Sequence, residues 1–119
     1  MFLQLLRDVV DGTDGGLAGI LMDAQGIPVE TYVRAPGGVD MAVVGAEYSV
    51  IVKSIRRAAE SLDAGGAREI AIQSDKMTTL IRMLNDDYFV AVALSPDANF
   101  GKGRYLMRTA APKLLAALA

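Results

Sequence analysis

Two almost uninterrupted apolar runs, Leu17–Met22 and Tyr88–Leu94, place the strongest constraint on the fold. A strand with one face in water alternates apolar and polar residues, because successive side chains point to opposite faces of the sheet. Short runs that are apolar throughout instead predict strands that are buried on both faces. These two strands therefore belong inside a sheet that is covered by helices, which predicts an α/β domain.

The remaining segments supply the other elements of one domain, residues 1–119. Residues 2–10 and the segment after Asn99 carry apolar residues at helical spacing, and a longer helix is predicted over Met41–Leu62 with Asp40 as its N-cap. Three further strands are predicted at Ile27–Val33, Glu69–Ser74 and Thr78–Leu84. The order is helix, hairpin, long helix, three-stranded meander and helix, with no repeat and no linker.

Pro28 assigns the second strand to an edge of the sheet. Proline has no N–H to donate to a neighbouring strand, so it is found in edge strands rather than central ones. The turn residues Ala35–Gly38 then separate this hairpin from the long helix.

Composition excludes several classes of function. The chain has no Cys and no His, which removes disulfides, thiol catalysis, common zinc sites and Ser–His pairs. A formal net charge of −2 argues against nucleic acid as a partner, and no apolar run is long enough to span a membrane. Gly101-Lys102-Gly103 lacks the spacing of a phosphate-binding loop. We therefore predict no enzyme activity, catalytic residue, metal or cofactor. The start of the chain lacks the pattern of a signal peptide, so we expect a cytoplasmic protein.

The long helix carries more apolar residues than one core stripe needs. The stripe is expected to be core and comprises Met41, Val44, Tyr48, Ile51, Val52, Ile55, Ala59 and Leu62. Val43, Ala46 and Val50 lie off this stripe, either as ordinary surface residues or because a partner covers a second face. Lys53, Arg56 and Arg57 either complement the negative end of the helix dipole or contact an acidic partner.

The element order and two segments resemble the roadblock/dynein light-chain family. Gly19–Val29 is similar to the family's first hairpin, in which an apolar strand runs into a D-x-x-G-x-P-V turn. Gly101–Leu114 resembles the last helix of bacterial members that partner Ras-like GTPases. The resemblance implies a roadblock-like, profilin-like fold with a five-stranded antiparallel sheet of mixed order 2-1-5-4-3, a long central helix, and N- and C-terminal helices.

The same resemblance implies a non-enzymatic homodimer that binds a small Ras-like GTPase, as a regulator of its GTP hydrolysis or as a scaffold. The third strand would pair with its copy, which makes Ile70, Ile72 and Ser74 the expected dimer interface. The expected partner-binding residues are Val43, Ala46, Val50, Lys53 and Arg57. Two alternatives stay open: a structural adaptor in a motor or scaffold complex, and a PAS-like or profilin-like sensory module with a ligand cavity.

Overall fold

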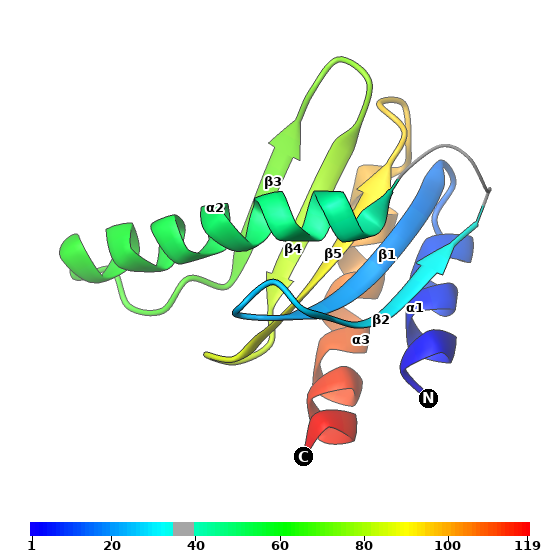
Figure 1. Cartoon of the computed structure of the whole chain (residues 1–119). Coiled ribbons are helices and arrows are strands. Elements are labelled where there is room, and N and C mark those ends of the chain that lie inside the picture. The colour runs from blue at the N-terminus through cyan, green and yellow to red at the C-terminus, as the bar shows by residue number, and fades with distance from the viewer. Residues whose placement is uncertain (35–39) are drawn as a thin grey trace.

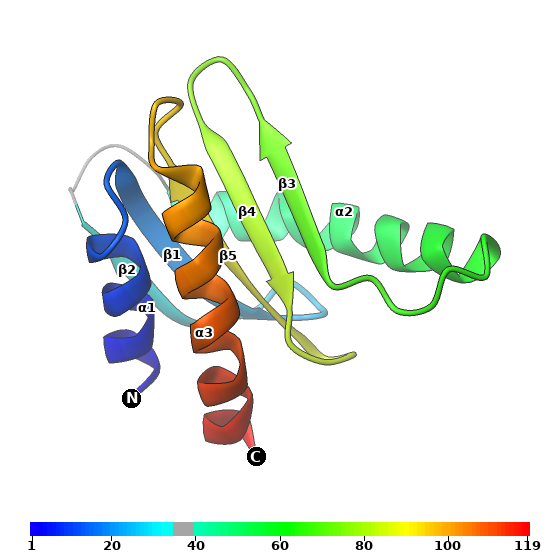
Figure 2. The ribbon, with the colours of Figure 1, turned by 180° about the vertical axis from the view of Figure 1, so that it is seen from behind.

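The computed structural model describes residues 1–34 and 40–119 and contains one five-stranded antiparallel sheet between two layers of helices. One long helix lies on one face of the sheet, and the N- and C-terminal helices lie side by side on the other (Figures 1 and 2). The predicted element order is confirmed. The predicted break at residues 35–38 lies outside the described residues. No helix in the described part of the chain is long and apolar enough to cross a membrane.

The two apolar runs form the centre of the sheet, as predicted. Strand β1 (Gly16–Asp23) pairs with β5 (Tyr88–Leu94), and Ile20 lies opposite Ala91. The order is β2-β1-β5-β4-β3, which the family resemblance implied. The edge strands are β2 (Pro28–Val33), as Pro28 predicted, and β3 (Glu69–Gln73). Strand β4 (Thr78–Met83) lies between β3 and β5.

Each face of the sheet has its own hydrophobic core. Helices α1 (Phe2–Asp11) and α3 (Phe100–Leu118) pack on one face and α2 (Met41–Ser61) on the other. The first core contains buried side chains from both terminal helices and from β1, β4 and β5, including Leu6, Val10, Leu21, Leu80, Val92, Met107 and Leu114. The second includes Ile20, Met22, Met41, Val52, Ile81 and Phe89.

Helix α2 corrects the predicted core stripe. Its buried residues are Met41, Gly45, Ser49 and Val52. Gly45 lets the helix approach β1 closely, because a Cβ there would lie 2.8 Å from the Sδ atom of Met22. Asp40 caps the helix as predicted, since its carboxylate accepts the backbone N–H groups of Ala42 and Val43.

The predicted stripe fails in the second half of α2, where Ile55 is 38% and Leu62 is 78% exposed. A 21-residue helix is about 31 Å long. In both views the C-terminal half of α2 extends past the β3 edge (Figures 1 and 2). The apolar periodicity continues along the helix, but this chain supplies no sheet beneath those residues.

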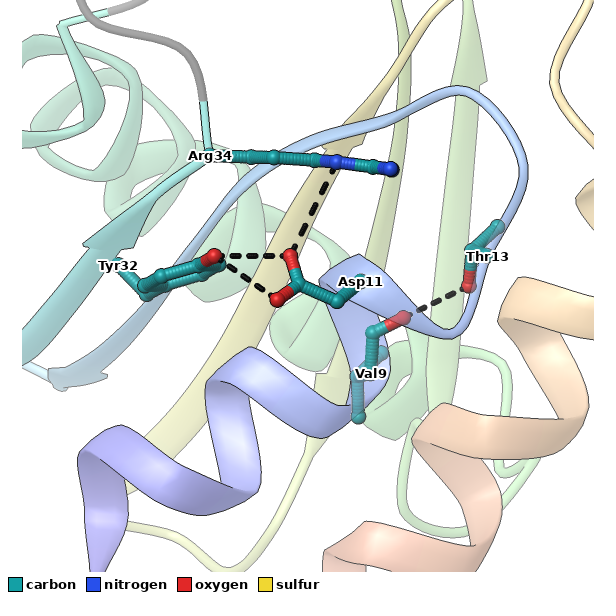
Figure 3. A network of polar contacts seen from close by, with 5 residues as sticks. All are labelled: Val9, Asp11, Thr13, Tyr32 and Arg34. Atoms are coloured by element: carbon teal, nitrogen blue, oxygen red, sulfur yellow. Dashed lines mark hydrogen bonds and ion pairs between the residues drawn. The ribbon is translucent and has the colours of Figure 1, made fainter.

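A polar network joins the end of α1 to edge strand β2 (Figure 3). The Tyr32 hydroxyl donates to both Asp11 carboxylate oxygens at 2.8 and 3.0 Å, and Arg34 Nε lies 3.9 Å from the same carboxylate. The Arg7 guanidinium lies 5.4 Å from the Tyr32 ring centroid. Thr13, which is fully buried, donates to the Val9 carbonyl and ends α1. This network fixes α1 against the hairpin.

We expect Tyr32 to titrate above its ordinary value of 10.0. The hydrogen bond to Asp11, desolvation and the charge of that carboxylate raise the Tyr32 pKa, because each disfavours tyrosinate. A raised folded-state pKa means that this contribution to stability is present at neutral pH and is lost as the pH rises through the folded pKa. Asp11→Asn should return the Tyr32 pKa toward 10.0, as NMR titration of the ring carbons can measure. An unchanged pKa in that variant would contradict the assignment.

Candidate interaction surfaces

The outer side of β3 is an unpaired sheet edge within the described residues. Backbone hydrogen bonds run from Met83 N to Arg68 O at 3.0 Å and from Ser74 N to Met77 O at 2.9 Å. Paired residues in an antiparallel ladder alternate between hydrogen-bonded and non-bonded pairs. Residues 68, 70, 72 and 74 therefore direct their N–H and C=O groups toward β4. The peptide groups of Glu69, Ala71 and Gln73 point out from the edge.

The expected interface residues Ile70, Ile72 and Ser74 all belong to the set whose peptide groups face β4. Ile70 and Ile72 are half-buried on the face that α2 covers, where they pack against the second core. Ser74 is exposed, but its N–H is already bonded to Met77. The groups that are available for pairing belong instead to Glu69, Ala71 and Gln73, which were not among the predicted interface residues. The alternation of the strand could have identified them, because every second residue of an edge strand carries the outward peptide groups.

The overhanging half of α2 is attached to the rest of the fold by Arg56. Its two Nη atoms each donate at 2.6 Å, one to the Asp86 carbonyl and the other to the Asn85 carbonyl, in the turn between β4 and β5. Arg56 is therefore a structural contact and differs from its neighbours Lys53 and Arg57, which are both exposed. The open cleft beside it is lined by polar residues, including Glu60, Asp63, Arg68 and Asp86, together with the partly buried Met83 and Leu84.

The outward face of α2 carries the expected partner-binding residues together. Val43 is 57% and Val50 is 63% exposed, and Ala46 between them is also exposed. The turn between β1 and β2 lies next to them, because a Cβ on Gly26 would be 4.0 Å from the Ala46 Cα. That turn presents Ile27, which is 60% exposed. Ile27 was missed because its distance along the chain hides its place beside the helix.

Arg56 should stabilise the second half of α2 locally. Arg56→Met removes two hydrogen bonds from a charged donor, and we expect a loss of about 1 kcal/mol of stability after allowing for solvent exposure. Amide hydrogen exchange should become faster in residues 53–61. Arg57→Met is the matched control, since Arg57 lies one position along and is exposed. Equal exchange in the two variants would contradict this role.

Comparisons with known proteins agree with the geometry. The model of the Roadblock/LC7 domain family matches residues 3–94. The chain is similar to MglC from Myxococcus xanthus, with 38% identity over 98% of both chains and a TM-score of 0.70. No curated protein matches it significantly.

More distant structures share the fold. A gliding protein, MglB from Thermus thermophilus, is 17% identical over 98% of this chain and 88% of its own, with a TM-score of 0.86. Profilin IA from Acanthamoeba castellanii is 10% identical over the whole of both chains, with a TM-score of 0.60. These structures confirm the predicted profilin-like arrangement of sheet and helices.

Proposed function

Because this chain belongs to the Roadblock/LC7 family, we propose that it acts in the cytoplasm as a non-catalytic homodimer that binds a small Ras-like GTPase. It would serve that GTPase as a scaffold or as a regulator of GTP hydrolysis. The observation that carries the proposal is the β3 side of the domain, where a sheet edge that is unpaired among the described residues and an overhanging apolar helix occur together. That the partner is a GTPase is inferred from the family resemblance.

The β3 edge is suited to pairing with its own copy in one register. A twofold axis normal to the sheet keeps each face on its own side, so each residue must oppose one whose side chain lies on the same face. Centring the pair on Ala71 sets Ile70 against the partner's Ile72 and Glu69 against the partner's Gln73. All the outward peptide groups of residues 69, 71 and 73 then find hydrogen-bond partners.

The neighbouring registers would give a less stable pairing of the two β3 strands than the register centred on Ala71. Moving the centre to Ile72 places Glu69 opposite the partner's Asp75 and Arg68 opposite the partner's Lys76. Like charges directly opposed across strands are destabilising. Moving it to Ile70 leaves Gln73 opposite the partner's Ala67, which lies outside β3. The register centred on Ala71 avoids both faults.

The same twofold axis would place the partner's sheet beneath the C-terminal half of α2. The overhang extends past β3, where the partner's sheet would continue. Ile55 and Leu62 would then be buried between the two subunits, as residues of a core stripe that spans both chains. The two α2 helices would lie side by side on one face of a ten-stranded sheet.

We place the GTPase on the outward faces of these paired helices. Val43, Ala46 and Val50 form an exposed apolar surface, which Ile27 extends. Twofold pairing brings two such surfaces together, toward the size that a specific transient contact requires. Lys53 and Arg57 would steer an acidic partner and fix its orientation more than they would add affinity.

The structural adaptor remains the second candidate, because the same dimer would serve it. The sensory module has less support from the described residues. The buried side chains form two cores, no buried side-chain nitrogen or oxygen lacks a hydrogen-bond partner among those described, and the cleft beside Arg56 is open to solvent. A ligand cavity normally presents polar groups that await a ligand.

The protein should be a dimer with twice the 12.6 kDa mass of one chain in light scattering. Ala71→Pro removes one outward N–H from each copy but no bond to β4, and should weaken dimerisation by about tenfold or more. Ile72→Lys should weaken it too, by placing a charge against the partner's Ile70.

Thr31→Pro is the matched control, because it removes an outward N–H from the opposite edge strand, β2. It should leave the dimer intact. A monomeric wild-type chain, or equal effects of the two proline variants, would show that the β3 edge is not the interface.

Val50→Arg should preserve the dimer and abolish GTPase binding, since a charge at the centre of a contact costs about 2 kcal/mol or more. Binding is measured against the Ras-like GTPases of the same genome, each loaded with GDP or a GTP analogue. Leu3→Arg is the control, because Leu3 is 38% exposed on the opposite face of the sheet. A monomeric Val50→Arg variant would identify the patch as dimer interface, and normal binding would exclude it as the docking surface.

A further inference from the structure

Helix α3 carries a concentration of positive charge that the proposed GTPase surface does not use. Lys102, Arg104, Arg108 and Lys113 all lie on it and are exposed, and the helix contains no Asp or Glu. The whole chain has a net charge of −2, so this helix stands out against an acidic background. Charge of one sign on one element is a feature that a partner of the opposite sign can recognise.

Two of these side chains lie on the side of α3 that faces β3. Arg104 binds Glu69 on β3 through two contacts, at 2.5 Å from Nη2 and 3.1 Å from Nε. Arg108 lies one helical turn further along the same side, and Leu115, 38% exposed, follows at helical spacing. Lys102 and Lys113 lie on the other side of the helix by the 100° rule.

Among the described residues, no helix covers strand β3 on this face of the sheet. Helix α1 packs on β1 and β2, and α3 packs on β4 and β5, with β3 beyond them (Figure 2). Ala71 and Gln73, whose side chains lie on this face, are exposed. The Glu69 carboxylate is occupied by Arg104, and Arg82 Nη1 lies 3.9 Å from it. Positive charge therefore exceeds negative charge along this side of α3.

In the proposed dimer this uncovered strand becomes the floor of a groove. The twofold axis puts both α3 helices on the same face, with the two β3 strands between them. Because α3 lies over β4 and β5, the two helix axes are separated by about four strand spacings, or about 19 Å. Packed helices lie about 8–10 Å apart. The groove therefore has room for one further helix, which would lie over the two β3 strands and cross the twofold axis.

We propose that this groove binds one acidic amphipathic helix of a second protein, with one helix per dimer. The inference rests on the proposed homodimer. Carboxylates on both flanks of the incoming helix would meet Arg108 and Arg104 of each subunit, whose planar guanidinium groups suit carboxylate oxygens. Its small or apolar face would rest on the two Ala71 residues.

A protein helix fits this surface better than an anionic membrane does. Helix α1 lies beside α3 in the same layer and carries Arg7, Asp8 and Asp11, the last paired with Arg34, so this layer does not present the uniform positive charge that anionic lipid prefers. The groove floor is also recessed below both α3 helices. A flat bilayer cannot reach it, whereas a single helix can.

The test uses the full chain and a synthetic helical peptide of Ala, Leu and Glu, about 18 residues and about 27 Å long. Leu occupies one stripe and Glu both flanks, and a second peptide carries Gln in place of Glu. Titration calorimetry should give one Glu peptide per two chains, with much weaker binding of the Gln peptide. Arg108→Glu should weaken binding by about tenfold or more, whereas Lys113→Glu should change it by less than about threefold.

Several outcomes would overturn the groove. These are no binding of the Glu peptide, equal losses in the two charge variants, or a stoichiometry of one peptide per chain. Sedimentation with phosphatidylcholine vesicles containing phosphatidylserine, lost in both variants, would assign α3 to lipid instead. Light scattering separates the two proposals: a dimer that fails to bind the peptide overturns only the groove, whereas a monomer overturns the dimer as well.

Discussion

The pairing of β1 with β5 is the interaction on which the rest of the structure depends. These strands are distant in sequence, and both are apolar on both faces, so neither is stable until helices cover the two sides of the sheet. Their register, with Ile20 opposite Ala91, sends one set of side chains toward α1 and α3 and the alternate set toward α2. A shift of one residue would exchange the two cores, and Gly45 would no longer face Met22.

The central pair also makes the two edges of the sheet unlike. Strand β2 follows β1 through a tight turn, and its pairing is interrupted by a register shift beside Pro28. Irregularities and proline are the usual protection of an edge against pairing with other chains. Strand β3 has a regular ladder to β4 and no proline, and its outward peptide groups alternate without interruption. The β2 edge is therefore protected and the β3 edge is competent for pairing, so any strand pairing between chains is expected at β3.

The sequence was sufficient for the elements and their order but not for the limits of the packing. The apolar runs, Pro28 and Asp40 each determine the structure of their own segment. They predicted the central strands, the edge strand and the helix N-cap, and all three predictions were confirmed. The stripe on α2 was partly wrong, because periodicity reports which side of a helix is apolar and not how far the sheet beneath it extends. Gly45 and Ser49 were missed because a close approach needs small residues, which hydrophobic patterns score as weak. Contacts such as Arg56 with Asn85 and Arg104 with Glu69 join distant segments, and no local pattern marks them.

The position of the Arg104–Glu69 pair bears on how the two faces of the domain communicate. Glu69 is the first residue of β3, and its outward peptide groups belong to the free edge while its side chain is held by α3. A ligand that competes for Arg104 would release the Glu69 side chain on the edge strand β3. The same strand carries Ile70 and Ile72 toward α2 on the opposite face. The five residues of β3 therefore carry the outward edge, one side chain held by α3 and two side chains that pack toward α2, so a ligand on the α3 face would act on the strand that pairs in the proposed dimer.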